Sequence, residues 1–262
     1  MNKKSDVLYI LPAMLGFGLF WVIPFAASFG YAFIDHNFSA RFVGLQNFKS
    51  LLENTYFRLA LKNTLLFSLL AVSVIMAVSV LLAICIARYA AKFSFIRSAF
   101  FLPVLLPSAT IVMFWNAYFA EVPPLPSLLC MYLWKYLGLN VMLLLTAITT
   151  LDRDMLDAAC IDGAGNWKQT FHIILPNITP SLFFTLILSL VNSMKIYRES
   201  YLMWGRYPDE SVYMLQNYID NHFAKMNYPN ISTAAIFFAV IVYMIVGVLY
   251  LLEHRWEKSI WK

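Results

Sequence analysis

Long stretches without a charged side chain are the feature that most restricts what this chain can fold into. Five of them cover residues 7–33, 63–87, 98–120, 177–194 and 231–252, and a sixth, 127–151, contains only Lys135. An α-helix needs about 20 predominantly apolar residues to cross the hydrocarbon core of a bilayer. The pattern therefore predicts an all-α polytopic membrane protein with six transmembrane helices in a single transmembrane domain, residues 1–262, whose core spans about 60–253.

The low charge content excludes several other classes of protein. Of the 262 residues, 61% are hydrophobic and 13% are charged, whereas soluble domains carry about 25% charged residues. So few charges do not cover a water-facing surface, which argues against a soluble enzyme, a disordered chain or a disulfide scaffold. The net charge of +5 is typical of basic loops on the cytoplasmic side of a membrane, so we expect a lipid bilayer and no nucleic acid as a partner.

The distribution of basic residues gives the expected orientation. If both termini are cytoplasmic, the inside segments 1–6, 88–97, 152–175 and 253–262 hold ten Lys and Arg, against eight in the longer outside segments. Positive charge in short loops marks the cytoplasmic side. We therefore expect both termini in the cytoplasm of a multi-pass protein.

The residue types that commonly act as metal ligands, disulfide partners or catalytic groups are scattered along the sequence. The three cysteines and four histidines have no spacing typical of metal ligands or disulfides. A nucleotide-binding loop ending in Gly-Lys-Ser/Thr is missing from the sequence. We therefore expect no catalytic residues, no metal and no cofactor in this chain, and not an enzyme.

Lys135 interrupts the fourth expected span and has two interpretations. A Lys at the centre of a membrane helix costs roughly 2.5–3.5 kcal/mol on insertion. Its ammonium group either extends to the outer interface or faces a hydrated pathway between helices. The same two interpretations apply to Lys195, Arg198 and Glu199, which follow the fifth span.

The segment 152–175 differs from the other connections between spans. Residues 152–161 predict a short helix with acidic residues in its first turn, which the helix dipole favours. Gly163 and Gly165 end it, a second short helix follows through Ile173, and Pro176 begins the fifth span, where proline is tolerated. Small residues, Ala158 and Ala159, suit close contact with another protein, although a plain interfacial loop fits the physical pattern as well.

This segment resembles the signature of ATP-binding-cassette (ABC) importer permeases. That signature is Glu-Ala-Ala, three residues, Gly, nine residues and Ile-x-Leu-Pro, and it aligns with Asp157-Ala158-Ala159, Gly163 and Ile173-x-Leu175-Pro176. The single departure is Asp157 in place of Glu, which keeps the charge and shortens the side chain by one methylene. The resemblance implies that 152–175 is a cytoplasmic coupling loop that docks on an ATPase subunit.

Further segments resemble the first permease subunit of maltose-type sugar importers. They are Phe42-Val-Gly-Leu-Gln-Asn-Phe48, Asn63-Thr-Leu65, Phe100-Phe-Leu-Pro103 and Trp134-Lys-x-Leu-Gly-x-Asn140. Two features depart from that group: Trp204-Gly-Arg-Tyr-Pro208 replaces the usual Gly-Gly-Pro turn, and the large extra outer domain of the maltose subunit is absent.

The resemblance implies the fold, partners and location of the chain. It implies a type I ABC importer permease fold in a bacterial inner membrane. The expected partners are a second homologous permease, ABC ATPase subunits that bind the ATP, an extracytoplasmic sugar-binding lipoprotein and a carbohydrate substrate. The implied coupling residues are Asp157, Ala158, Ala159, Asp162, Gly163, Ala164, Ile173, Leu175 and Pro176.

Substrate contacts in this family come from the fourth and fifth spans, which here implies Trp134, Lys135, Tyr136, Asn140, Asn192, Ser193 and Lys195. Aromatic faces with amides and hydroxyls suit a sugar, but the same residues also serve as interfacial aromatics or as hydrogen bonds between helices. Lys135 and Lys195 leave open an anionic cargo, such as glycerol phosphate or a uronic acid. An ion-coupled secondary transporter is a weaker alternative, because the uncharged stretches contain no Asp or Glu.

Overall fold

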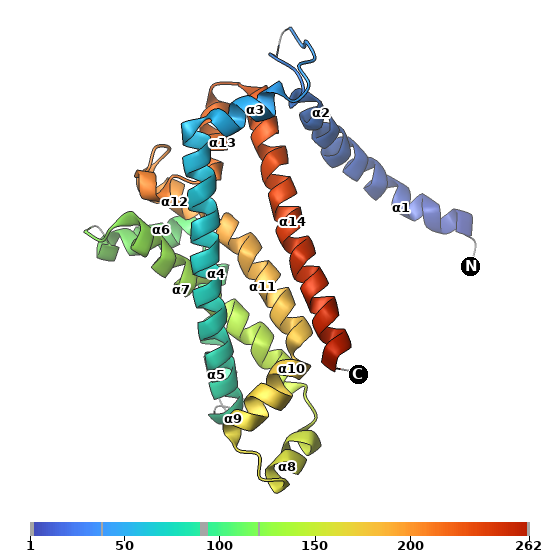
Figure 1. Cartoon of the computed structure of the whole chain (residues 1–262), viewed down its shortest axis with the longest axis vertical. Coiled ribbons are helices and arrows are strands. Elements are labelled where there is room, and N and C mark those ends of the chain that lie inside the picture. The colour runs from blue at the N-terminus through green and yellow to red at the C-terminus, as the bar shows by residue number, and fades with distance from the viewer. Residues whose placement is uncertain (1–2, 38, 90–93, 120, 261–262) are drawn as a thin grey trace. The chain divides into compact units, whose positions relative to one another are not determined.

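A computed structural model of the chain describes residues 3–37, 39–89, 94–119 and 121–260. The described residues form helices joined by short turns, and an isolated bridge between Ile34 and Phe42 is the one β-type pairing among them. Five of the helical segments are long and apolar enough to cross a membrane. The prediction of an all-α polytopic protein is confirmed (Figure 1).

The chain divides into two compact units, which are described separately. The first comprises Met1–Ala60 and Leu215–Tyr243, and the second comprises Leu61–Met214 and Met244–Lys262. The helices α4 (Thr55–Tyr89) and α14 (Tyr228–Ile260) pass from one unit into the other.

The first unit contains the N-terminal helices and the segment that precedes α14. Besides parts of α4 and α14, its helices are α1 (Lys3–Phe17), η1 (Gly18–Val22), α2 (Ile23–Tyr31), α3 (Gln46–Glu53) and α13 (Leu215–Ala224). Phe57 is fully buried and packs edge-on against Tyr218 and Phe237, with ring centroids 5.5 and 5.6 Å away. Asn47 Nδ2 donates to the carbonyl oxygens of Ala32 and Ile34, which fastens α3 to the turn after α2.

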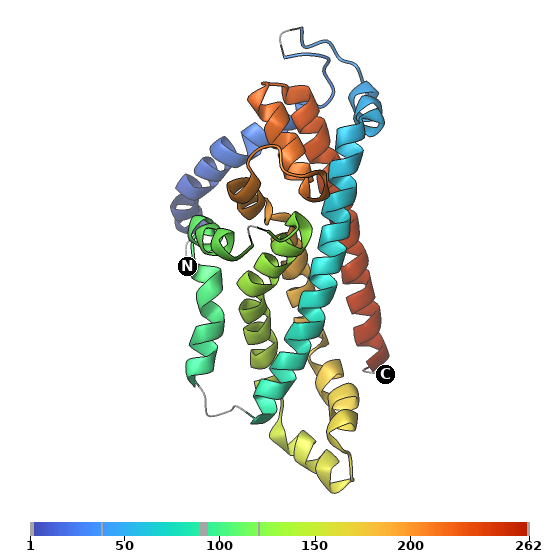
Figure 2. The same cartoon turned by 90° about the vertical axis from the view of Figure 1, so that its left-hand side faces the viewer.

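The second unit contains the remaining helices. They are α5 (Ser94–Leu105), α6 (Ser108–Phe119), α7 (Pro124–Thr149), α8 (Arg153–Ile161), α9 (Asn166–Gln169), η2 (Thr170–Ile174), α10 (Leu175–Asn177), α11 (Thr179–Met194), α12 (Tyr197–Trp204) and η3 (Glu210–Val212). Its central helix is α7, whose buried Leu128 and Tyr132 pack against Phe67, Ala71 and other residues of α4. Figure 2 shows α4, α7 and the α8–α9 segment from a second direction.

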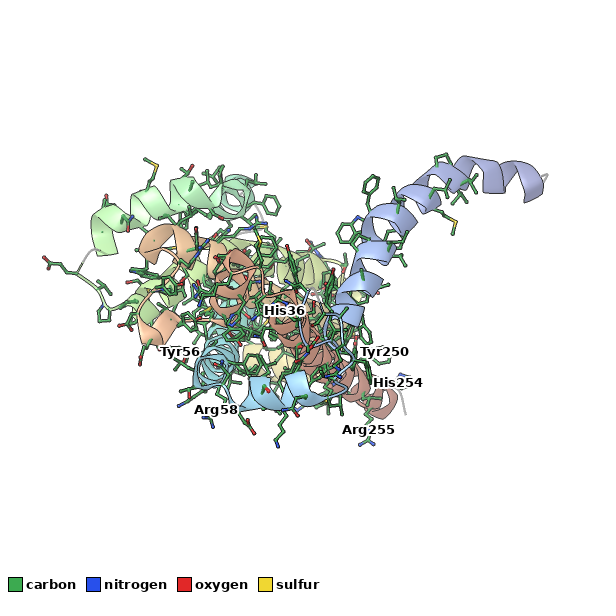
Figure 3. The ribbon with its side chains drawn as sticks, turned by 90° about the horizontal axis from the view of Figure 1, so that it is seen from above. His36, Tyr56, Arg58, Tyr250, His254 and Arg255 are labelled. Carbon is green, nitrogen blue, oxygen red and sulfur yellow. The ribbon has the colours of Figure 1, made fainter. Side chains whose placement is uncertain are left out.

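Five of the six expected spans overlap helical segments that are long and apolar enough to cross a membrane. The candidate spans Ile10–Tyr31, Thr55–Arg88, Pro124–Thr149, Thr179–Trp204 and Tyr228–Trp256 overlap the expected 7–33, 63–87, 127–151, 177–194 and 231–252. Near the C-terminal end of α14, Tyr250 and His254 stack one turn apart, with ring centroids 6.4 Å apart (Figure 3).

The third expected span, 98–120, is not one helix in the described residues. It consists of α5 and α6, which are separated at Leu106 and Pro107; Ala120 lies outside the described residues. Pro107 has no backbone N–H, and its ring disfavours helical geometry at the preceding residue. The third expected span is therefore made of two helices that meet at this proline.

Two other prolines coincide with locally widened helix. The π-helical stretches η1 and η2 each end two residues before a proline, at Pro24 and Pro176. A proline ring clashes with the carbonyl of the residue four positions earlier, here Phe20 and His172, and a wider turn at that carbonyl relieves the clash. Pro176 lies in α10, and α11 begins at Thr179, so the fifth span begins slightly later than the sequence predicted.

Close packing between α5 and α7 depends on Gly138. A Cβ atom at this residue would lie 1.6 Å from the backbone carbonyl oxygen of Phe100. Because the obstructing atom belongs to the backbone, α5 as a whole must move before any side chain fits.

We expect Gly138→Ala to destabilise the protein by about 1–3 kcal/mol, the usual cost of overpacking. The measurement is the thermal unfolding midpoint of the full-length protein in detergent. Gly247→Ala is the matched control, because its Cβ meets nothing within 4 Å. Equal midpoints for the two variants would contradict the close contact between α5 and α7.

Candidate functional site

The segment 152–175 forms a helical hairpin at one end of the second unit. Its helix α8 lies beyond the C-terminal end of α4 in both views, and α9 lies beside that end (Figures 1 and 2). Asp152 caps α8, and its Oδ1 accepts a hydrogen bond of 3.0 Å from the backbone N–H of Asp154. The predicted short helix is therefore present, with its acidic start.

A left-handed turn ends α8 at Gly163, whose φ is +79°. The N–H of Ala164 donates to the carbonyl of Ala159, and the N–H of Gly163 donates to that of Cys160. These two bonds define a Schellman motif, in which glycine supplies the left-handed residue. The geometry explains why a glycine stands at this position and turns the chain sharply into α9.

The outward face of α8 is small, acidic and partly apolar. Asp157 and Ala158 are exposed, and Ile161 is 87% exposed. Trp167 of α9 and Phe171 of η2 are also exposed, and their rings stack 5.7 Å apart. Exposed apolar residues gathered at the tip of a hairpin are typical of a surface that another protein covers.

Two residues that the sequence analysis missed hold the hairpin together. Gln169 is buried, and its Nε2 donates to Cys160 Sγ and to the carbonyl of Ala164. Arg88, at the end of α4, donates through Nη2 to the carbonyl of Asn166 and to Thr170 Oγ1, each at 2.7 Å. The hairpin is thus fastened to the membrane helix α4, and no local sequence pattern indicates bonds that join residues about 80 positions apart.

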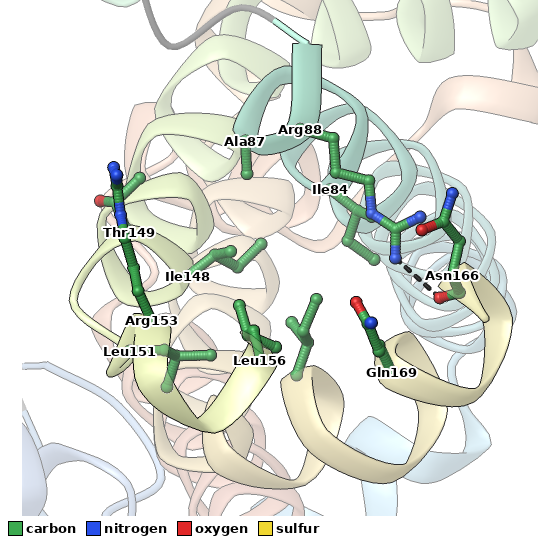
Figure 4. A pocket seen from close by; sticks show the side chains of 11 residues that line it. Ile84, Ala87, Arg88, Ile148, Thr149, Leu151, Arg153, Leu156, Asn166 and Gln169 are labelled. Atoms are coloured by element: carbon green, nitrogen blue, oxygen red, sulfur yellow. Dashed lines mark hydrogen bonds between the residues drawn. The ribbon is translucent and has the colours of Figure 1, made fainter. Parts of the chain in front are cut away.

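A cavity of about 340 Å³ lies between the hairpin and the ends of α4 and α7. Figure 4 shows Arg88 and Arg153 at its edge and Ile84, Ile148 and Leu156 on its walls. The cavity therefore combines two guanidinium groups with an apolar interior.

A buried ion pair joins three helices in the other half of the unit. Lys135 Nζ of α7 and Glu199 Oε1 of α12 are 2.5 Å apart, and their side chains are 10% and 1% exposed. Ser108 at the start of α6 donates to the same carboxylate oxygen at 2.7 Å. Lys135 therefore neither extends to an interface nor stands alone: its charge is neutralised by Glu199, a partner that the sequence analysis did not assign.

Several expected substrate residues form hydrogen bonds between helices. Asn140 Nδ2 donates to Ser189 Oγ at 2.6 Å, which joins α7 to α11. Ser193 Oγ donates to Ser68 Oγ at 2.9 Å, which joins α11 to α4. These contacts fit the alternative interpretation, in which polar residues connect helices.

Asn192 and the Asn140 carbonyl oxygen differ from those residues. Among the residues that the structure describes, the Asn192 amide has no hydrogen-bond partner, although the residue is only 7% exposed. Asn140 Oδ1 is likewise buried without a partner in the described chain. Such groups are costly to leave unsatisfied, so they are available to a polar ligand.

The remaining expected substrate residues lie apart from one another. Trp134 is 37% exposed and stacks on Phe114 of α6, with ring centroids 6.3 Å apart. Tyr136 is 7% exposed, and Lys135 Nζ lies 5.2 Å from its ring centroid. Lys195, at the end of α11, is exposed.

Comparison with known proteins identifies one protein family. Residues 79–258 match the family described as "Binding-protein-dependent transport system inner membrane component". The chain is 25% identical to the probable starch degradation products transport system permease protein AmyD of Thermoanaerobacterium thermosulfurigenes, over 95% of this chain and 94% of the relative. It is 28% identical to the arabinooligosaccharides transport system permease protein AraP of Bacillus subtilis, over 78% and 73%.

Other similar proteins are named for different cargo. The sn-glycerol-3-phosphate transport system permease protein UgpA of Pectobacterium atrosepticum is 27% identical over 70% of each chain. Among solved structures, a chain of a bacterial ABC transporter involved in the import of the acidic polysaccharide alginate superposes with a TM-score of 0.82 at 22% identity, covering 97% of this chain and 96% of that one. This likeness shows that the two chains share a fold.

Proposed function

Because this chain belongs to the family of binding-protein-dependent transport system inner membrane components, we propose that it is the first permease subunit of an ATP-driven sugar or oligosaccharide importer. The observation that carries the proposal is the 152–175 hairpin, whose outward face and left-handed Gly163 turn present a docking surface. The family sets the class of protein, and the names of its sugar-transporting relatives support the cargo.

In this proposal the chain supplies a pathway and a coupling element, and other chains supply the energy. It pairs with a second permease, two ATPase subunits bind the ATP, and an extracytoplasmic binding protein delivers the substrate. When the ATPase subunits close, the docked loops are drawn together and the helices rock from inward-open to outward-open. ATP binding shifts the population because it favours one of the two states.

The contacting residues on the ATPase side are proposed to be Asp157, Ala158, Ala159, Asp162, Gly163 and Ala164. Ile173, Leu175 and Pro176 have a different role, because they belong to the π-helical stretch and short helix that lead into α11. They set the direction in which the hairpin leaves the membrane helices.

The direction of the helices supports a cytoplasmic hairpin and six crossings. Arg88 at the C-terminal end of α4 bonds to the hairpin, and Ile148 at the C-terminal end of α7 lines the same cavity. Both helices therefore end at one side, so the chain between them must return across the bilayer. We assign this return to α5 and α6 together, which places both termini on the side of the hairpin, in the cytoplasm.

A neutral sugar is the favoured cargo. The Lys135 charge is already paired with Glu199, so this lysine adds no net positive charge to a pathway along α7. A glycerol phosphate or uronic acid cargo is the second candidate, supported by the name of the relative UgpA and by the exposed Lys195.

A panel of substrates tests the proposal. The importer is purified with its co-encoded partners, and ATP hydrolysis is measured with neutral oligosaccharides, uronic acid oligomers and glycerol 3-phosphate. We expect stimulation by a neutral oligosaccharide. Stimulation by an acidic compound alone would select the second candidate, and an importer that hydrolyses ATP only with a non-carbohydrate would refute the sugar assignment.

The Asn192 amide is the pathway group whose loss we expect to alter transport without disturbing the fold. Asn192→Ala removes donors and an acceptor that have no partner among the described residues, so the unfolding midpoint should stay unchanged. We expect a weaker sugar response, by about fivefold to tenfold, the value of one or two hydrogen bonds. Ser193→Ala is the control that removes an interhelical bond, and an unaltered sugar response of Asn192→Ala would remove this residue from the pathway.

A further inference from the structure

A polar cavity of about 230 Å³ in the first unit has no part in the transport mechanism proposed above. The segment after α2, the start of α3 and the turn between α13 and α14 line it, and one of its lining residues, His36, is labelled in Figure 3. The described lining contains a carboxylate and an ammonium group, and its amides are those of Asn37, Asn47, Asn227 and Asn230. Apolar residues in that lining are limited to Met226 and Pro229. Because the centres of protein interfaces are ordinarily more apolar than this, the walls suit a small polar ligand.

Side-chain hydrogen bonds hold the walls of the cavity in place. Asn37 Nδ2 donates to the carbonyl oxygen of Met226 at 2.5 Å, which joins two segments 189 positions apart. Met226 has a φ of +53°, a left-handed conformation that residues other than glycine rarely adopt and that is concentrated at functional sites. The cavity is therefore formed before any ligand enters it.

Several groups on the cavity wall lack a partner among the described residues. Asn37 Oδ1 is buried there without a hydrogen bond, which is costly unless a ligand supplies the donor. Asp35 and Lys225 are exposed, and neither forms an ion pair within the described part of the chain. Asn230 donates its backbone N–H to Asn227 Oδ1 at 3.3 Å, but its side-chain amide has no partner in that part of the chain. The wall therefore offers both acceptors and donors to a ligand.

The charges on the wall select against an ion. Asp35 attracts a cation that Lys225 repels, and the reverse holds for an anion, since both residues line the same cavity. A hydroxyl group both donates and accepts hydrogen bonds, so a neutral ring that carries several hydroxyls satisfies acceptors and donors together. The cavity is smaller than the about 300–1,000 Å³ of sites for drug-sized ligands, which limits the ligand to a single ring.

We propose that this cavity binds one neutral sugar ring at the extracytoplasmic face of the protein. Two candidate membrane spans have their ends beside it, since Ile10–Tyr31 ends shortly before Asp35 and Tyr228–Trp256 begins at its wall. With both termini in the cytoplasm, these ends lie on the outer side. The outer position rests on the proposed function, whereas the class of ligand rests on the cavity itself. The expected substrate residues of α7 and α11 do not line the cavity, so it is an additional site for carbohydrate.

The methyl group of Met226 reports binding at this cavity directly, because Met226 lines it and is 68% exposed. The sample is the full importer complex in lipid nanodiscs with methyl-labelled methionine, and the probes are the methyl glycosides of glucose, galactose, mannose and xylose. We expect the Met226 signal in the NMR spectrum to shift with the concentration of at least one of these sugars. Met113, which is 77% exposed on α6 and does not line the cavity, gives the control signal. No shift of the Met226 signal with any of the sugars would overturn the proposal.

Two substitutions remove wall groups that have no partner in the described chain. We expect Lys225→Gln and Asn230→Ala each to weaken the binding of the best sugar about fivefold to tenfold, the value of one hydrogen bond, with an unchanged unfolding midpoint. Lys49→Gln is the matched control, because it removes an exposed positive charge from the same unit and does not line the cavity. Equal affinities of Lys225→Gln and Lys49→Gln, or tighter binding of glucuronate or glucosamine than of the neutral sugar, would contradict the assignment.

The extracytoplasmic binding protein is the competing occupant. If it shifts the Met226 signal and no sugar does, the cavity accepts a protein side chain and the sugar assignment is overturned. A complex whose ATP hydrolysis responds to sugar while the Met226 signal does not keeps the proposed function and loses this inference. A complex that binds sugar through Lys225 but hydrolyses ATP only with a non-carbohydrate would refute the proposed function and keep this inference.

Discussion

Replacing Lys135 by Met is expected to destabilise the protein by about 3–5 kcal/mol, the usual cost of leaving one partner of a buried ion pair uncompensated. The Glu199 side chain is 1% exposed, so water cannot replace the ammonium group. Among the described residues, Ser108 would remain as the one side-chain donor to its carboxylate. The thermal unfolding midpoint and the yield of folded complex measure the loss.

The double variant Lys135→Met with Glu199→Leu tests whether the unpaired carboxylate causes this loss of stability. Replacing both members of a buried ion pair by apolar residues is often neutral or stabilising. We therefore expect the unfolding midpoint to recover most of the way to wild type. A double variant as unstable as Lys135→Met alone would contradict a destabilisation caused by the unpaired carboxylate.

Transport by the same double variant separates two roles of Lys135. If Lys135 acts only through Glu199, sugar uptake recovers together with the fold. If Lys135 also touches the cargo, the recovered protein folds but transports poorly. The two readouts together therefore place this residue either in the scaffold or in the pathway.

The second large effect is expected at the turn that ends α8. Gly163→Val should reduce sugar uptake by tenfold or more while the protein still reaches the membrane. The φ of +79° is a left-handed conformation, which costs other L-residues roughly 1–2 kcal/mol and is a genuine outlier for a β-branched side chain. Nothing lies within 4 Å of a Cβ at this position, so the effect comes from the backbone alone.

Gly163→Asn is the matched control for this turn. Asn visits the left-handed region more readily than other non-glycine residues, so we expect it to retain most of the uptake. The measurements are uptake in proteoliposomes and the amount of protein in the membrane. Equal uptake by the Val and Asn variants would contradict a role for the left-handed turn.

Helix positions and the hairpin were predictable from the sequence because they depend on local patterns. Uncharged stretches located five membrane helices, although the segment Thr55–Arg88 begins eight residues before the expected 63 and Thr179–Trp204 ends ten residues after the expected 194. The acidic start of α8 and the glycine at its end follow from capping preferences that act over one helical turn. The broken third span was predictable too, since Pro107 was visible, but apolar content alone does not distinguish one helix from two.

The partners of the candidate residues were not predictable in this way. Lys135 and Glu199 are 64 positions apart, and Arg88 and Thr170 are 82 apart. Their pairing depends on how α7, α12, α4 and the hairpin pack, which no local periodicity encodes. A charged residue in an apolar helix does indicate that a partner of opposite charge exists. For Lys135 that partner is Glu199, which the sequence did not assign.

We propose that this chain meets an ATPase subunit through the outward face of α8. A photo-crosslinking residue placed at Ile161, which is 87% exposed, tests it directly, with Tyr207, 69% exposed in the segment after α12, as the control position. We expect a cross-link from residue 161 to the ATPase subunit and none from residue 207. A cross-link from residue 207 to the ATPase, or none from residue 161 in an intact complex, would contradict it.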